Sequence, residues 1–150
     1  MAGSFRLARV LRLRTQLRRR IQDEVALLGA RLAAVRSRIA DAQHAQGAVH
    51  VEVARALGGA GATGAEVARW GAWGQALAAR EAGLAVEGVH LAEAILRGRE
   101  ELVARRQEER KLERLREKAL VRAQAEDIRQ EALLLDDLAL RRQDGKGSGR

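Results

Sequence analysis

Hydrophobic residues recur along the first third of the chain in alternating steps of four and three. Two series of seven positions carry this pattern, and most of their members are Leu, Ile, Val or Ala. The first series is Leu7, Arg14, Ile21, Leu28, Val35, Ala42 and Val49, and the second is Leu11, Arg18, Val25, Leu32, Ile39, Gln46 and Val53. Such spacing is typical of a coiled-coil seam. It predicts one long helix over residues 4–57, with Ser4 as its N-cap.

Glycines interrupt the pattern after this helix. Six of them fall within seventeen residues, at Gly58, Gly59, Gly61, Gly64, Gly71 and Gly74. Glycine costs about 1 kcal/mol per helical position and suits the end of a helix and a chain reversal. We therefore expect a turn followed by a short irregular piece over residues 58–72.

A second helix is expected over residues 73–142. Its apolar positions are Leu77, Leu84, Leu91, Ile95, Leu102, Leu112, Leu115 and Leu120, with polar breaks at Gly98, Arg105 and Glu109. Each predicted helix has one apolar stripe and needs a partner, and the glycine turn makes antiparallel pairing within the chain the simplest arrangement. The predicted fold class is all-α: a long antiparallel two-helix coiled coil, or α-helical hairpin. It forms one unit over residues 1–143, followed by a disordered tail over residues 144–150.

The longer second helix should extend past the N-terminus of the first. Arg14 and Arg18 occupy seam positions near that end, opposite residues 105–109. Because buried like charges are costly, we expect the two helices to be splayed and hydrated there.

The composition supports long helices. The chain has no proline, cysteine or tyrosine, and aromatic residues make up 2% of it, which argues against a thick globular interior. No apolar run approaches the ~20 residues that span a bilayer, and the N-terminus lacks the apolar core of a secretory signal. A cytoplasmic protein without disulfides is expected.

The charge is unevenly distributed. Of 28 basic and 20 acidic residues, seven arginines and no acid lie in residues 1–22. A basic end suits an acidic protein, a nucleic acid or an anionic membrane surface. Because no aromatic residues are interleaved with the arginines, base stacking is not supported, and nucleic acid is the less favoured partner.

Two motifs suggest catalytic or metal chemistry but have a simpler interpretation. Residues 59–64 match the dinucleotide pattern GxGxxG, yet a predicted helix precedes them where the motif requires a strand. Glu87 and His90 have the spacing of a di-metal ligand pair, but the other histidines, His44 and His50, supply no second pair. We expect no catalytic residue, metal or cofactor, and hence no enzyme.

Trp70 and Trp73 are the strongest candidates for partner binding. A two-stranded seam is too narrow to bury an indole fully, and tryptophan is enriched at interface hot spots. The alternative is that one or both fold over the hairpin as a local plug.

Four features, in this order, resemble the FliJ family of the bacterial flagellar export apparatus. They are the opening Phe5-Arg-Leu7-x-x-Val10-Leu11-x-Leu13-Arg14, the pair Trp70 and Trp73 followed by Leu77, the charged stretch from Lys111 to Lys118, and the ending from Asp136 to Arg142. The resemblance covers nearly the whole chain.

The resemblance implies a stalk-like cytoplasmic coiled coil at the inner face of the cell membrane, at the base of the flagellum. FliJ-like proteins contact a hexameric flagellar export ATPase, the cytoplasmic domain of the export gate, and export chaperones. By position, the gate-contacting residues would be Trp70, Trp73, Leu77 and Leu84. The ATPase-facing end would carry Arg6, Arg9, Arg12, Arg14, Arg18, Asp136, Asp137 and Arg141.

Three alternatives remain open at this point. The first is the equivalent stalk of a virulence-type secretion system. The second is a basic nucleic-acid-binding coiled coil, and the third is a structural coiled coil that self-associates through its seam.

Overall fold

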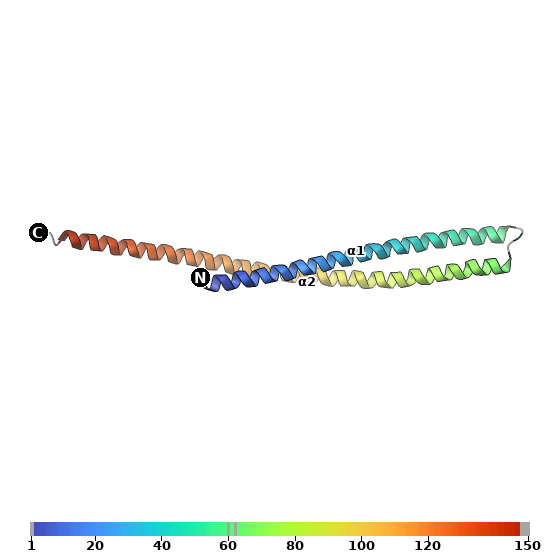
Figure 1. Cartoon of the computed structure of the whole chain (residues 1–150), viewed down its shortest axis with the longest axis horizontal. Helices are drawn as coiled ribbons and strands as arrows, with labels where there is room; N and C mark the ends of the chain where they lie inside the picture. Colours follow the sequence, from blue (N-terminus) through green and yellow to red (C-terminus); the bar gives the residue numbers. More distant parts are fainter. Residues whose placement is uncertain (1, 60, 62, 148–150) are drawn as a thin grey trace. The chain divides into compact units, whose positions relative to one another are not determined.

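Two helices make up the computed structural model, which describes residues 2–59, 61 and 63–147, with the backbone alone for 2–5. Helix α1 is Ala2–Gly58 and helix α2 is Gly64–Gly147 (Figure 1). No strand occurs in the described ranges. The all-α hairpin predicted from the periodicity is confirmed.

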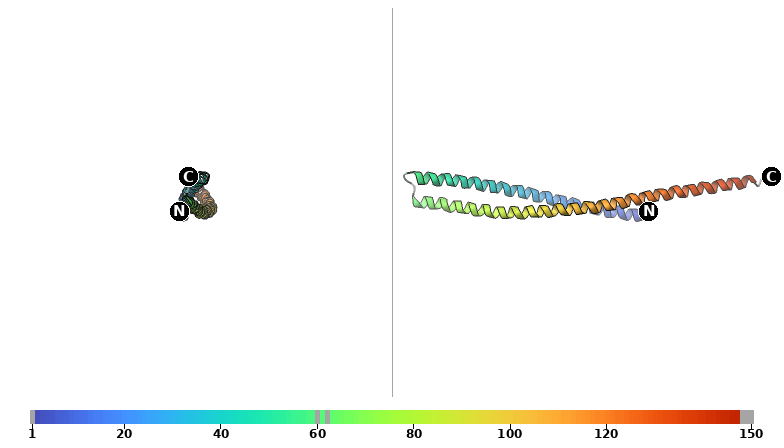
Figure 2. Two further views of the ribbon diagram at one scale, coloured as in Figure 1. Left: turned by 90° about the vertical axis from the view of Figure 1, so that its right-hand side faces the viewer. Right: turned by 180° about the vertical axis from the view of Figure 1, so that it is seen from behind.

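The chain divides into two compact units where one was expected. The hairpin unit is Arg19–Val103, and the terminal unit comprises Met1–Arg18 and Ala104–Arg150. The division falls where the seam positions of both helices change from apolar to charged side chains. Within the hairpin unit, α1 and α2 run side by side and antiparallel on either side of the turn (Figures 1 and 2).

The core of the hairpin unit is the predicted seam. Its buried apolar residues are Val35, Ala42 and Val49 of α1 and Leu77, Leu84 and Ile95 of α2. All ten of the α1 seam positions predicted between residues 21 and 53 are buried or half-buried. Since burying a large aliphatic side chain contributes about 1.5–3 kcal/mol, this continuous seam supplies the main stabilisation of the unit.

Three glycines of α2 also lie in the seam, each against a valine of α1. A Cβ atom added at Gly74 would lie 3.4 Å from Val49, one at Gly88 would lie 3.7 Å from Val35, and one at Gly98 would lie 2.5 Å from Cγ2 of Val25. The steps between these contacts are equal on the two helices, so the register is constant along the unit. The approach is tightest at Gly98, where the absent side chain leaves room for a β-branched partner.

The second helix begins earlier than expected. Residues 65–72, predicted as irregular, are the first turns of α2. The Thr63 hydroxyl accepts a hydrogen bond from the backbone N–H of Glu66 at 3.3 Å, so Thr63 caps the helix. Thr63-Gly-Ala-Glu66 is a capping-box sequence, and this cap outweighs the helix-weakening effect of Gly71.

The turn itself depends on one glycine. Gly61 has a φ of +126°, in the region that side-chain-bearing residues rarely adopt. Its neighbours Ala60 and Ala62 lie outside the described residues. The reversal expected near Gly58–Gly64 is therefore present, but it is confined to the five residues between the helices.

The ends of the helices also differ from the expected ones. Helix α1 begins at Ala2, so Ser4 lies inside the helix and is not its N-cap. Helix α2 continues to Gly147, into the stretch predicted as a disordered tail, because no proline stops it. Leu115 and Leu120 are 52% and 47% exposed, since they fall outside the three-and-four spacing of the α2 seam.

The close approach at Gly98 gives a stability prediction. Gly98→Ala should lower the free energy of unfolding by about 1 kcal/mol or more, because a methyl group there overlaps Val25. Gly83→Ala is the matched control: a Cβ there meets nothing within 4 Å, so the better helix former should add roughly 0.5–1 kcal/mol. Urea denaturation followed by circular dichroism measures both. Equal stabilisation by the two substitutions would contradict the observed approach.

Candidate partner-binding surfaces

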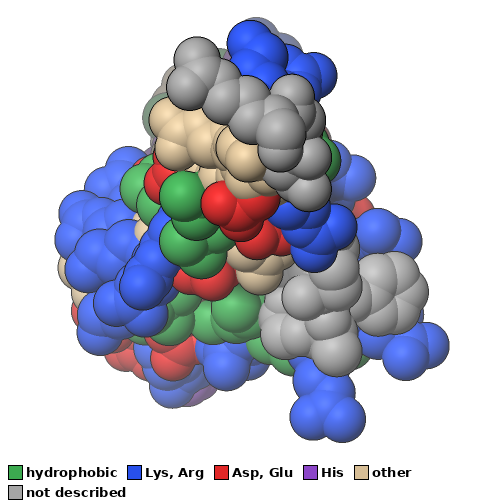
Figure 3. Space-filling view, turned by 90° about the vertical axis from the view of Figure 1, so that its left-hand side faces the viewer, with side chains coloured by type: hydrophobic (Ala, Val, Ile, Leu, Met, Phe, Trp, Pro, Cys, Tyr) green, Lys and Arg blue, Asp and Glu red, His purple; other side chains and the backbone are tan. Residues whose placement is uncertain are grey.

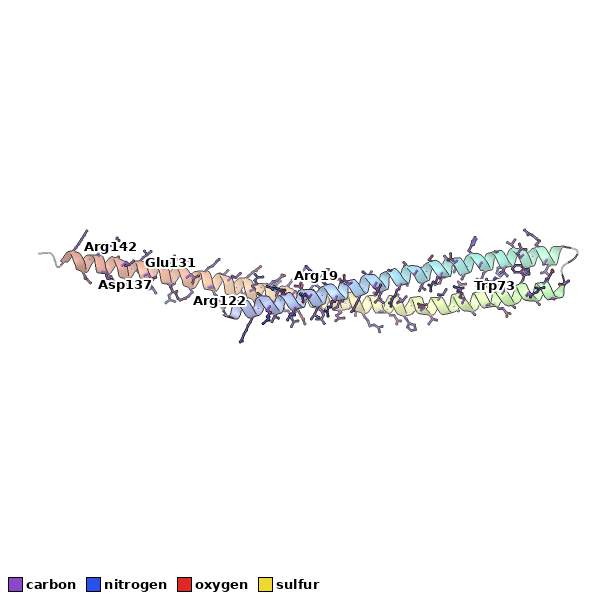
Figure 4. The ribbon with its side chains drawn as sticks, viewed as in Figure 1. Arg19, Trp73, Arg122, Glu131, Asp137 and Arg142 are labelled. Carbon is purple, nitrogen blue, oxygen red and sulfur yellow. The ribbon has the colours of Figure 1, made fainter. Side chains whose placement is uncertain are left out.

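Two exposed indoles stand on the first turns of α2. Trp70 is 38% exposed and Trp73 is 54% exposed. Together with Glu66 and Arg69 they line a shallow depression on the hairpin unit, which we call the tryptophan surface (Figure 4 labels Trp73). More than a third of each indole remains accessible, so neither tryptophan is a buried plug over the hairpin.

Trp73 also borders a groove between the two helices. The groove is lined by Arg38, Asp41, Ala42 and Ala45 of α1 and by Trp73, Leu77 and Arg80 of α2. The small side chains Ala42 and Ala45 leave space beside the indole, while Arg38, Asp41 and Arg80 surround it with both signs of charge. Apolar area inside a charged rim is the usual anatomy of a protein-binding patch.

Trp70 lies beside the turn. A second depression joins it to the end of α1 and to the turn through Glu52, Arg55, Ala56, Gly59, Gly61 and Glu66. Arg55 pairs with Glu52 at 3.2 Å, one helical turn apart. The capped start of α2 therefore fixes Trp70 next to a polar surface that remains open to solvent.

The two leucines expected on this surface lie elsewhere. Leu77 is 6% exposed and Leu84 is 9% exposed, because both pack in the seam against α1. Their expected role in direct partner contact is therefore corrected to a structural one. Of the four predicted gate-contacting residues, the structure leaves Trp70 and Trp73 accessible.

A polar contact ties the two helices together near the tryptophan surface. The Gln43 Nε2 atom of α1 donates a hydrogen bond of 2.8 Å to Glu81 Oε1 of α2. Gln46, one turn further along α1, has a buried Nε2 atom that has no hydrogen-bond partner among the described residues. Since an unpaired buried amide is unfavourable, Gln46 does not stabilise the seam at this position.

In the terminal unit, Arg14 and Arg18 of α1 lie opposite residues 105–109 of α2, as predicted. The side chains that they contact there are carboxylates. Arg14 forms an ion pair with Glu108. The Arg18 Nε atom donates to both carboxylate oxygens of Glu109, at 3.1 and 2.9 Å. Glu109 is 8% exposed. The expected splaying from buried like charges is wrong at this point, because opposite charges neutralise each other across the seam.

The remaining arginines of the predicted ATPase-facing end point outward. Arg6, Arg9 and Arg12 are exposed, next to the exposed Val10 and Leu13. In the end-on view of Figure 3, lysine and arginine side chains project outward with hydrophobic and acidic side chains between them. The exposed Arg6, Arg9 and Arg12 give this end of α1 a basic surface of the kind that attracts an acidic partner.

The acidic residues of that end lie farther along α2. Asp136, Asp137 and Arg141 are exposed, and Arg141 pairs with Asp137 at 3.2 Å along the helix. They belong to the part of α2 that extends past the N-terminal residues of α1, where every described side chain from residue 120 onward is exposed. The structure therefore separates these acids from the paired Arg14 and Arg18.

The motifs that suggested metal or nucleotide chemistry have ordinary places in the fold. His44, His50, Glu87 and His90 are exposed on the two helices. Among the residues that the structure describes, no three acidic or histidine side chains come together as a metal site requires. The glycine motif over 59–64 forms the turn and the first residue of α2.

Within the described ranges, neither helix contains a segment apolar enough to cross a lipid bilayer.

Comparison with protein-family models, with curated proteins and with solved structures finds no match to this chain. The resemblance to the FliJ family therefore rests on the four sequence features alone.

The buried ion pair gives a second stability prediction. Glu109→Ala should lower the free energy of unfolding by roughly 1–3 kcal/mol, because the Arg18 Nε–H group loses the carboxylate whose two oxygens it contacts in a mostly desolvated site. Glu108→Ala removes the neighbouring carboxylate, whose pair with Arg14 is about half exposed, and should cost at most about 1 kcal/mol. Urea denaturation of both variants tests the difference. Equal losses would mean that burial does not distinguish the two pairs.

Proposed function

We propose that this chain is a non-catalytic, stalk-like component of a bacterial flagellar type III protein export apparatus. It links the hexameric export ATPase to the cytoplasmic domain of the export gate and binds export chaperones. In this role it acts in the cytoplasm, peripherally at the inner face of the cell membrane. The observation that carries the proposal is the exposure of Trp70 and Trp73 on a capped helix start.

The tryptophan surface fits a protein partner. Two indoles three residues apart lie on one side of α2, and each borders a depression with charged walls. Leaving such side chains in water is unfavourable, and a partner that covers them gains both apolar burial and rim ion pairs. We assign this surface to the export gate.

The outward arginines of the terminal unit fit a different partner. Arg6, Arg9 and Arg12 occur on α1 at three-residue spacing and are exposed. Arg14 and Arg18 are engaged with Glu108 and Glu109, so they act in holding α1 and α2 together. We assign the three outward arginines to contact with the ATPase, whereas Arg14 and Arg18 have a structural part.

The test measures two bindings separately. Purified wild-type chain should bind both the gate domain and the ATPase of a flagellar export system. The double variant Trp70→Ala/Trp73→Ala should lose about thirtyfold in gate affinity, as expected for hot-spot tryptophans, and keep its ATPase affinity. The triple variant Arg6→Glu/Arg9→Glu/Arg12→Glu should show the opposite pattern.

A matched control replaces apolar side chains elsewhere on α2. Val86 and Val89 are 58% and 57% exposed and have the same spacing as the tryptophans. Val86→Ala/Val89→Ala should leave both affinities unchanged. If the double tryptophan variant binds the gate domain as tightly as the wild-type chain does, the assignment of this site to the gate is wrong. If the wild-type chain binds neither the gate domain nor the ATPase, the proposed export role is wrong. Binding to the corresponding proteins of a virulence-type secretion system instead would assign the chain to that system.

The exposed arginines also favour a second candidate, nucleic-acid binding. That function predicts affinity for duplex DNA that falls steeply with salt as phosphate contacts release counterions. Affinity retained at physiological salt, and lost in the triple arginine variant, would favour this candidate over export.

A further inference from the structure

The exposed end of α2 carries a second apolar stripe. Six positions follow one another in steps of four, three, four, three and four: Val121, Ala125, Ile128, Ala132, Leu135 and Ala139. The three large members are 64%, 67% and 66% exposed in that order. We call these six residues the distal stripe.

The distal stripe does not continue the seam that α2 shares with α1. The last half-buried residue of α2 is Ala119, and Ile128 follows it by nine residues. Nine residues are two and a half turns of helix, so Ile128 lies on the opposite side of α2. The distal stripe therefore remains free when α1 is packed in place.

We propose that the distal stripe binds the distal stripe of a second copy of this chain, with the two helices antiparallel. In such a pair the first core position of one helix faces the second core position of the other. A register centred at Gln130 puts Ala125 opposite Leu135, and the same register pairs Ala132 with Ile128 and Ala139 with Val121. Every one of the six layers then combines one small and one large side chain.

The opposite orientation fits poorly. In a parallel pair each residue would face its own copy, so the three alanine layers would bury little area and the three large layers would be crowded. Size matching is what makes an interface pack as densely as a protein interior. The antiparallel pair is also isologous, the commonest symmetry of protein dimers.

In this register the charges next to the stripe form two attractive pairs and two like-charge contacts. Arg122 and Asp136 follow the first and last large residues, and the register places Arg122 of each copy beside Asp136 of the other. Near the centre, Arg129 of one copy faces Arg129 of the other on one flank, and Glu131 faces Glu131 on the opposite flank. Glu126 lies three residues before Arg129 on the same helix, within reach of an ion pair with it. The matching of small with large side chains selects the register. The two Arg122–Asp136 pairs allow that register to be tested by reversing the charges.

The first experiment measures the oligomeric state of the full chain by sedimentation equilibrium. Wild type should form a reversible dimer. Leu135→Glu should weaken that dimer about a hundredfold, because it brings two carboxylates into apolar layers. Leu133→Glu is the matched control: Leu133 is 60% exposed and lies off the stripe, so its replacement should leave the dimer unchanged.

Circular dichroism of both variants should show wild-type helix content, since neither residue is buried in the hairpin. A monomer at all concentrations would overturn the proposal, and so would equal weakening by the two substitutions. Either result is independent of the export role, which is measured with other residues and other partners.

The second experiment tests the orientation. Arg122→Asp alone and Asp136→Arg alone should each weaken the dimer, because each replaces two attractive contacts by repulsive ones. An equal mixture of the two variants should form a heterodimer tighter than either homodimer, because both attractive pairs are restored between unlike copies. A mixture no tighter than the separate variants would contradict the antiparallel register.

Discussion

The fold depends on the burial of one apolar stripe along each helix. A single helix cannot bury its own apolar stripe. In the hairpin unit, the pairing of α1 with α2 buries the stripes of both helices. Valine of α1 meets glycine of α2 at three points with equal steps, so the stripes pair in a single register. Large apolar side chains outside the seam, among them Trp73 and Ile128, remain exposed and are available to other molecules.

The division of α2 into covered and uncovered parts follows from helix length. Helix α1 has 57 residues and α2 has 84, so a short turn leaves the end of α2 without an intrachain partner. Charged residues interrupt the shared seam within the terminal unit, where Arg18 and Glu109 replace aliphatic residues and pair across it. From Val121 onward α2 carries an apolar stripe on its other side, which is the surface expected for contact with another helix.

The fold could be predicted from the sequence because heptad spacing places apolar side chains on the side of each helix that becomes buried when two helices pair. The seam of α1 and the buried Leu77, Leu84 and Ile95 followed from that spacing alone. Three features required chemistry beyond periodicity. Thr63 caps the N-terminus of α2 by accepting a hydrogen bond from Glu66. Glu109 and Gly98 were predicted to interrupt the apolar seam of α2. Instead, Glu109 pairs with Arg18 across the seam, and Gly98 allows close contact with Val25. Of the four residues predicted to contact the export gate, both tryptophans are exposed and the two leucines are core residues, so contact with a partner stays a prediction for the tryptophans.

The most direct test of the account is the distance between the two helices in a single chain. The chain has no cysteine, so Gln43→Cys/Glu81→Cys introduces one thiol on each side of an observed contact between α1 and α2. At low concentration a short bis-maleimide should join the two thiols within one molecule, leaving the mass of a monomer. Cross-linking only between molecules, or none at all, would contradict the antiparallel hairpin that positions the tryptophan surface.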